Sequence, residues 1–127
     1  LYLGRADDEK LEKITALEQL RLIKLSELRE KTAYFFTAPE YPKELLRWKG
    51  TESNEVIKKH LEKICELLMD WEKIMAYAEK EGKGEVLWPL RAALSGRRAS
   101  PGPFEIMEVL GKEESEKRIQ YALRLLD

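Results

Sequence analysis

Residues 87–105, LWPLRAALSGRRASPGPFE, hold three arginines and carry no acidic residue before their final glutamate. The same stretch contains two large aromatic residues, two glycines and three prolines. Guanidinium groups bind phosphates, aromatic rings stack on unpaired bases, and backbone N–H groups donate to base edges. The stretch therefore has the parts of a binding site for single-stranded RNA, with Arg91, Arg97, Arg98 and Phe104 as candidate contacts.

The turn residues of this stretch predict how its first arginine is presented. We expect a short helix over 84–95, with Pro89 near its start and Gly96 as its left-handed end. Pro89 would then fix the direction in which Arg91 projects. Arg91 and Ser95 lie one turn apart on one face of such a helix.

Beyond that helix, Arg97 and Arg98 are expected in a loop, and Ser100 and Pro101 should start a further helix whose N–H groups can bind an acceptor. A loop guanidinium most simply meets phosphates, so Arg97 and Arg98 are the predicted phosphate contacts. The same residues also fit an exposed helix–helix turn, with solvated arginines, Ser100 as an N-cap and Phe104 in the core. Composition alone leaves both interpretations open.

Residues for catalysis or metal binding are hard to find elsewhere. His60 is expected as a solvated residue on an amphipathic helix, five positions from Cys65, with no second Cys/His pair for zinc. Glu113, Glu114 and Glu116 fall in the first turn of a helix, where they complement its dipole. There is no glycine loop of the GxxxxGK type. We therefore predict no catalytic, cofactor-binding or metal-binding residue in this chain.

Length and charge limit the possible functions. The chain has 127 residues and a mass of 14.9 kDa, a length that suits one domain or two small subdomains. Its formal net charge is −1. No global field attracts DNA or a membrane surface, so any polyanion site must be local. Its single cysteine suits a reducing compartment, and we expect a cytoplasmic protein without a membrane span. Since the first residue is leucine, we expect a piece of a longer protein.

Apolar periodicity predicts helices throughout, so the expected fold class is all-α, a compact stack of short helices in two small subdomains. The expected helices cover about 8–31 with a possible break, 42–48 with Pro42 at the first position, a segment begun by Ser53 or Asn54, one begun by Asp70, then 84–95, 100–110 and 112–126. The helix after Asn54 should bury Val56, Ile57, Leu61, Ile64, Cys65 and Leu68. A composition change near residues 50–54 suggests subdomains 1–50 and 51–127.

A motif of more than thirty residues carries a family resemblance. It runs as PLRAALSG over 89–96, SPGPFE over 100–105 and LGKE over 110–113, and ends with Arg118-Ile119 and Ala122-Leu123. This motif resembles the C-terminal anticodon-binding region of bacterial glutamyl-tRNA synthetases. The segments LRLIKLSELREKTAYFF and DWEKIMAYAEKEGKGEVLWPLR extend the resemblance over nearly the whole chain.

The resemblance implies an α-helical cage that grips the anticodon loop of tRNA(Glu). By position, the second and third anticodon bases would be met by Arg91, Ser100, Pro101, Pro103 and Phe104. Arg21 is the best match for the arginine that meets the first base. Two positions depart from the family: Pro103 stands where leucine is frequent and lacks an N–H, and Ser100 stands where threonine is frequent.

For the parent protein, the resemblance implies a monomeric glutamate–tRNA ligase that uses ATP with magnesium, with its catalytic motifs outside this chain. Two alternatives stay open. One is the similar anticodon-binding domain of class I lysyl-tRNA synthetases, although the LSGRRASPGPFE run favours glutamate. The other is a helical protein-interaction module with no role in RNA binding.

Overall fold

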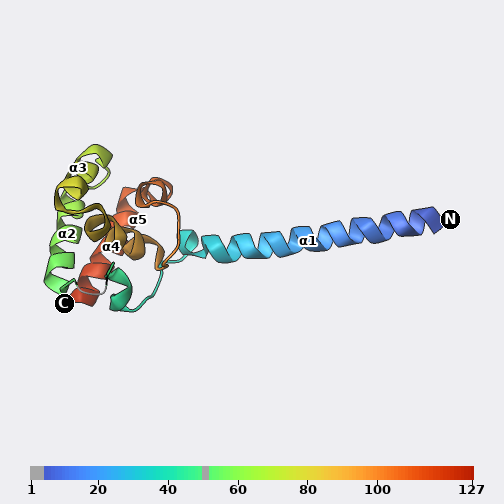
Figure 1. Ribbon diagram of the computed structural model, residues 1–127, viewed down its shortest axis with the longest axis horizontal. Coiled ribbons are helices and arrows are strands. Elements are labelled where there is room, and N and C mark those ends of the chain that lie inside the picture. The colour runs from blue at the N-terminus through green and yellow to red at the C-terminus, as the bar shows by residue number, and fades with distance from the viewer. Residues whose placement is uncertain (1–4, 50–51) are drawn as a thin grey trace. The chain divides into compact units, whose positions relative to one another are not determined.

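The computed structural model describes residues 5–49 and 52–127, with only the backbone described for residues 5–11, 20, 21 and 23. Every regular element in these ranges is a helix, which confirms the all-α prediction (Figure 1). The elements are α1 (Arg5–Phe36), a 3-10 turn η1 (Lys43–Leu46), α2 (Asn54–Glu66), α3 (Trp71–Glu81), α4 (Lys83–Ser95) and α5 (Pro103–Leu126).

The chain divides into two compact units, residues 1–33 and residues 34–127. The second unit contains η1 and α2 to α5, together with the last turn of α1. The division of the chain into subdomains 1–50 and 51–127 that the sequence suggested stays a prediction.

Helix α1 continues through the position where a break was considered possible. Its sequence contains neither glycine nor proline and is rich in leucine, glutamate and lysine, which are strong helix formers. It ends at Phe36, shortly before Pro39, because the residue that precedes a proline is disfavoured in the helical conformation. Several of its apolar side chains are exposed: Ile14, Leu17, Leu22, Leu25 and Leu28.

The helix starts in the middle of the chain follow local capping rules. Ser53 accepts a hydrogen bond from the Val56 N–H at 3.3 Å, and Asp70 accepts one from the Lys73 N–H at 3.2 Å, so both predicted caps are confirmed. The expected helix over 42–48 is shorter in the structure. It is the single 3-10 turn η1, and Pro42 precedes it as the cap instead of occupying its first position.

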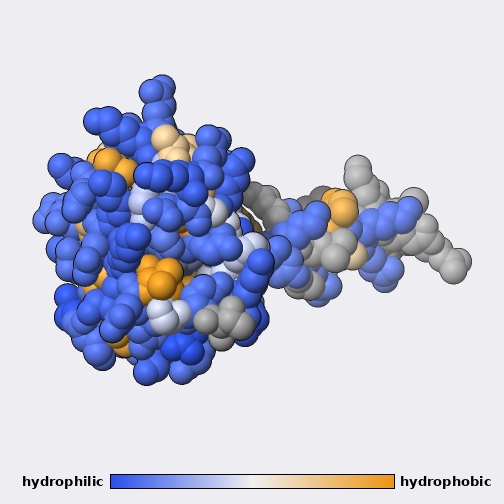
Figure 2. All heavy atoms as spheres, turned by 60° about the vertical axis from the view of Figure 1, so that its left-hand side comes forward, coloured by the Kyte–Doolittle hydropathy of each residue, from blue (hydrophilic) through white to orange (hydrophobic). Residues whose placement is uncertain are grey.

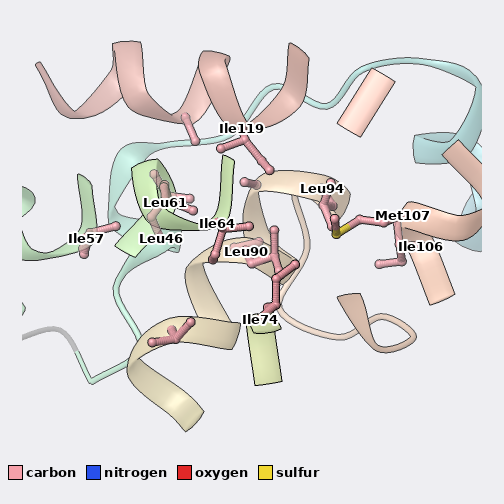
Figure 3. Close-up of a cluster of buried hydrophobic side chains, with 14 of the residues drawn as sticks. Leu46, Ile57, Leu61, Ile64, Ile74, Leu90, Leu94, Ile106, Met107 and Ile119 are labelled. Carbon is pink, nitrogen blue, oxygen red and sulfur yellow. The ribbon is translucent and has the colours of Figure 1, made fainter. Parts of the chain in front are cut away.

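Helix α4 packs against α2, α3, α5 and η1, and the core lies around it (Figure 3). The largest buried side chains include Leu46, Ile57, Leu61, Ile64, Ile74, Leu90, Leu94, Ile106, Met107 and Ile119, all labelled in Figure 3. Hydrophilic residues cover most of the visible surface of residues 34–127, and apolar residues reach it only in separate spots (Figure 2). Val56 was expected in the core but is exposed.

His60 corrects the expectation of a solvated histidine. Its side chain is only 5% exposed, and its Nδ1 lies 2.7 Å from the Tyr77 hydroxyl. The reason is helical spacing, because residues 57, 60, 61 and 64 share the buried face of α2. Burial lowers the pKa of His60, and the carboxylates of Glu81 and Glu85 offset part of this effect.

Pro89 lies inside α4, which corrects its expected place near the helix start. Helix α4 begins at Lys83, directly after Gly82, whose φ of 114° ends α3. Pro89 is fully buried and removes one backbone hydrogen bond from the helix interior. The orientation of Arg91 must therefore come from other contacts.

Helix α5 begins at Pro103 and not at Ser100 and Pro101. Gly102 takes the extended N-cap conformation, and Pro103 fits the first helical position because its missing N–H would have no intrahelical partner. The Ser100 hydroxyl donates to the Pro101 carbonyl at 3.0 Å, so the N-cap role considered for Ser100 is wrong. The expected separation near residue 111 is present as a kink at Gly111, with φ 84° and ψ 168°.

Candidate functional site

Arg91 is held in place by two neighbours. Its guanidinium carbon lies 5.0 Å from the centre of the Trp88 ring, and its Nη2 donates to the Arg98 carbonyl at 3.2 Å. The Trp88 ring is fixed in turn, since its indole N–H donates to the Leu45 carbonyl at 2.8 Å. Arg91 is half-buried, so its planar group is oriented and still reaches the surface.

The loop that follows α4 has a defined shape. Gly96 adopts φ 67° and ψ 20°, and its N–H donates to the Ala92 carbonyl at 2.7 Å, which confirms the predicted left-handed stop. The Ser95 hydroxyl donates to the Arg91 carbonyl at 2.9 Å and accepts from the Arg97 N–H at 3.2 Å. A Cβ atom at Gly96 would lie 2.4 Å from the Cβ of Pro39, so the loop also rests tightly on residues 39–41.

Arg97 and Arg98 differ in their surroundings. The Arg97 guanidinium carbon lies 5.2 Å from the centre of the buried Tyr34 ring. Burial raises the pKa of Tyr34, and the charges of Arg97 and Arg118 partly offset that rise. Arg98 is exposed while its carbonyl receives the hydrogen bond from Arg91. Both arginines lie in the loop, as predicted, and only Arg98 is fully at the surface.

Arg118 supports this loop from inside the molecule. Its Nη1 donates to the Leu94 carbonyl at 2.7 Å, and its Nε donates to Glu114 at 3.0 Å. The Arg118 side chain is 2% exposed. It therefore fixes the last turn of α4, from which the loop departs. The sequence signal was the i,i+4 spacing of Glu114 and Arg118 on the face that also carries Ile119.

A pocket of about 300 Å³ brings two of the predicted site residues together. Its lining consists of Trp48, Lys83, Gly84, Leu87, Trp88, Arg91 and Pro103. Lys83 and Arg91 give it positive charge, and none of these residues is acidic. Sequence reasoning missed Trp48 and Lys83 as members of the site. Trp88 stands within the arginine-rich stretch and could have been found there. Trp48 is forty positions away, and no sequence pattern pointed to it.

The other predicted residues lie outside this lining. Ser100 and Pro101 belong to the loop before α5, and Phe104 packs on Trp71 with ring centres 5.3 Å apart. Arg21 falls within α1, but its side chain lies outside the described part of the structure. A larger cavity of about 740 Å³, between residues 38–40 and α5, is lined by none of the predicted residues.

The residues with described side chains include no group of three His, Cys, Asp or Glu placed to hold a metal ion. Burial raises the pKa of the Cys65 thiol to about 11, so this cysteine is a poor nucleophile at neutral pH. None of the helices in the described ranges is long and apolar enough to cross a membrane.

Comparison with known proteins identifies the family. A family model described as an anticodon binding domain matches residues 2–123. Glutamate–tRNA ligase from Clostridium acetobutylicum is 36% identical over 130 residues, which is 92% of this chain and 27% of the relative. The ligase from Clostridium tetani is 39% identical over 132 residues, covering 94% of this chain and 27% of the relative.

A relative of lower sequence identity gives the same result. Glutamate–tRNA ligase from Anaeromyxobacter sp. is 31% identical over 131 residues, covering 97% of this chain and 28% of the relative. The chain thus spans little more than a quarter of the length of the curated relatives it matches. No solved structure matches it significantly. Because the family model covers almost the whole sequence, the chain belongs to the anticodon binding domain family.

Proposed function

We propose that this chain is the anticodon-recognising part of a glutamate–tRNA ligase and binds the anticodon loop of tRNA(Glu). The observation that carries the proposal is the oriented guanidinium of Arg91 in a positively charged pocket of about 300 Å³. A planar guanidinium can donate two bonds to a base edge, which fits the readout of an unpaired base. The family match and the ligase relatives support this assignment.

The proposed base contacts keep the residues that the sequence indicated: Arg91, Ser100, Pro101, Pro103 and Phe104 for the second and third bases, and Arg21 for the first. The geometry supports different tasks within this set. Pro103 has no N–H to donate and offers an apolar surface beside Arg91. The Ser100 hydroxyl, whose proton is engaged by the Pro101 carbonyl, retains lone pairs for a base donor.

The ligase reaction itself is proposed for the parent protein, since the chain covers only 27% to 28% of its relatives. ATP with magnesium would be bound there and not by this chain. We further propose that the protein is a cytoplasmic monomer, because tRNA charging takes place in that compartment and RNA binding by this site needs no second copy.

A titration with tRNA tests the proposal. The 127-residue chain should bind tRNA(Glu) weakly, and more tightly than a tRNA(Glu) changed only at the second or third anticodon base. Each neutralised phosphate should add about −0.7 to the slope of log affinity against log salt. A preference for tRNA(Lys) would instead favour the lysyl-tRNA synthetase alternative, and no RNA binding would favour the protein-interaction module.

The phosphate contacts have a test of their own. Arg97→Ala and Arg98→Ala should weaken binding about equally for tRNAs that differ only in the anticodon, because phosphates carry no sequence information. Arg124→Ala, which removes an exposed arginine of α5 outside the loop, is the matched control. A loss that depends on the anticodon would assign Arg97 or Arg98 to base readout, and affinity equal to the control would remove them from the interface.

A further inference from the structure

Trp48 forms one wall of the pocket that contains Arg91, although it comes from a distant part of the chain. Its indole is 40% exposed, an unusual position for the largest apolar side chain. A Cβ atom at Gly84 would lie 2.4–2.5 Å from three carbon atoms of the six-membered ring of the Trp48 indole. The ring therefore rests directly on the backbone of the first turn of α4, at a distance that only glycine permits.

The two tryptophans of the pocket have different environments. The Trp88 indole N–H donates to the Leu45 carbonyl, and the guanidinium carbon of Arg91 lies 5.0 Å from the centre of the Trp88 ring. The Trp48 ring is instead covered by the ammonium of Lys49, 4.4 Å from its centre. Lys49 is exposed, and a cation–π contact at an exposed site is weak, so its ammonium can leave the ring at little cost.

The pocket chemistry indicates what would take the place of that ammonium. Its two charged members, Lys83 and Arg91, are cations, and its other walls are apolar or aromatic. This combination suits a flat aromatic group that carries a neighbouring negative charge. An unpaired nucleotide has both, since its base stacks on an aromatic ring while its phosphate meets a cation.

We propose that Trp48 is the stacking surface for one unpaired base of the RNA loop, held in position by Gly84 and flanked by Lys83. This inference rests on the proposed function and adds a residue that neither the motif nor the resemblance named. Stacking is tolerant of base identity, because every base has a π-face. Trp48 therefore contributes affinity at this site, and Arg91 contributes discrimination.

The experiment uses the 127-residue chain and an RNA stem–loop with the anticodon-arm sequence of tRNA(Glu), followed by fluorescence anisotropy. Trp48→Ala should weaken binding roughly tenfold, within the range measured for single base–aromatic stacks. Trp48→Phe should retain most of the affinity. Phe36→Ala, which removes an aromatic side chain that is 86% exposed and outside the pocket, is the matched control and should bind like the wild type.

A second variant keeps the test independent of folding. Gly84→Ala should displace the Trp48 ring and weaken RNA binding. The melting temperature of Gly84→Ala shows whether its fold is intact. Because alanine is a better helix former than glycine, its helix propensity should not destabilise α4, so weaker binding at an unchanged melting temperature indicates a displaced ring. RNA loops that lack one base each then allow a double-mutant cycle between Trp48→Ala and each removed base. One abasic position should weaken binding to the wild type and have no further effect on Trp48→Ala.

The outcomes distinguish this inference from the proposed function. If the wild type does not bind the stem–loop, the proposed function fails and the inference fails with it. If the wild type binds and Trp48→Ala binds equally well, only the stacking role is refuted. The same conclusion follows if every abasic position costs the same in wild type and Trp48→Ala.

Discussion

Replacing Arg118 by methionine tests whether its buried guanidinium holds the end of α4. The change removes the 2.7 Å bond to the Leu94 carbonyl and the 3.0 Å bond to Glu114. A hydrogen bond from a charged donor contributes about 1.5–3 kcal/mol, and the carbonyl left unpaired adds a cost of similar size. The contact with Glu114 is discounted to below about 1 kcal/mol because that side chain is 37% exposed.

Methionine returns part of this loss by burying an apolar chain of similar length, roughly 1–2 kcal/mol. We therefore expect the free energy of unfolding to fall by about 3 kcal/mol. For a unit of the size of residues 34–127, each kcal/mol lowers the melting temperature by roughly 4–8 °C. The unfolding free energy of Arg118→Lys should lie between those of the wild type and Arg118→Met, since lysine keeps the charge and loses the planar set of guanidinium donors.

Urea unfolding followed by circular dichroism measures this effect. Lys117→Met is the control, because Lys117 neighbours Arg118 on the same helix and its side chain is 70% exposed. Its unfolding free energy should change by less than about 0.5 kcal/mol. Equal stabilities of Arg118→Met and Lys117→Met would refute the reasoning, because the buried bond to Leu94 and the bond to Glu114 would then contribute nothing.

Three further predictions concern the loop and the core. Arg91→Lys should cost about 1–3 kcal/mol in affinity for tRNA(Glu) and much less for a tRNA changed at the second or third anticodon base; equal weakening for both would make Arg91 a phosphate contact. Gly96→Ala should lower the free energy of unfolding by about 1–3 kcal/mol, because Gly96 has a φ of 67° and an added Cβ would meet Pro39. Gly102→Ala is the control in the same urea titration and should be near neutral, because no atom lies within 4 Å of an added Cβ there. Because burial lowers the pKa of His60 below 6.5 in the folded protein, the unfolded chain takes up the proton first, so stability should fall as the pH drops below 6.5. In His60→Gln this part of the pH dependence should disappear from the unfolding curves.

Local sequence rules predicted the caps and stops of the helices. Ser53 and Asp70 each bond to an N–H three residues ahead, and Gly96 ends α4 through its own backbone conformation. These interactions depend on neighbours in the chain, so the sequence contains all the information they need. The three arginines of the candidate site were found for the same reason, since they stand within one short stretch.

Contacts between distant segments could not be predicted in this way. Trp48 meets Gly84, and Arg118 reaches the Leu94 carbonyl, only after the helices pack. Two of the wrong interpretations, for Pro89 and His60, have local causes. Pro89 was placed near a helix start by its usual preference, although buried packing keeps it inside α4. For His60, the sequence already showed that residues 57, 60, 61 and 64 share one helix face. This spacing places His60 in the core although its side chain is polar.

The hydrogen bonds around Ser95 and Gly96 have a kinetic consequence for the proposed RNA complex. Because the loop is shaped before RNA arrives, encounter does not have to wait for the loop to rearrange. Rate constants for association should then be similar for RNAs that differ at one anticodon base, since electrostatic attraction to the arginines is the same for all of them. Differences in affinity should lie in the lifetimes of the complexes, so the protein would reject a wrong anticodon by releasing it quickly.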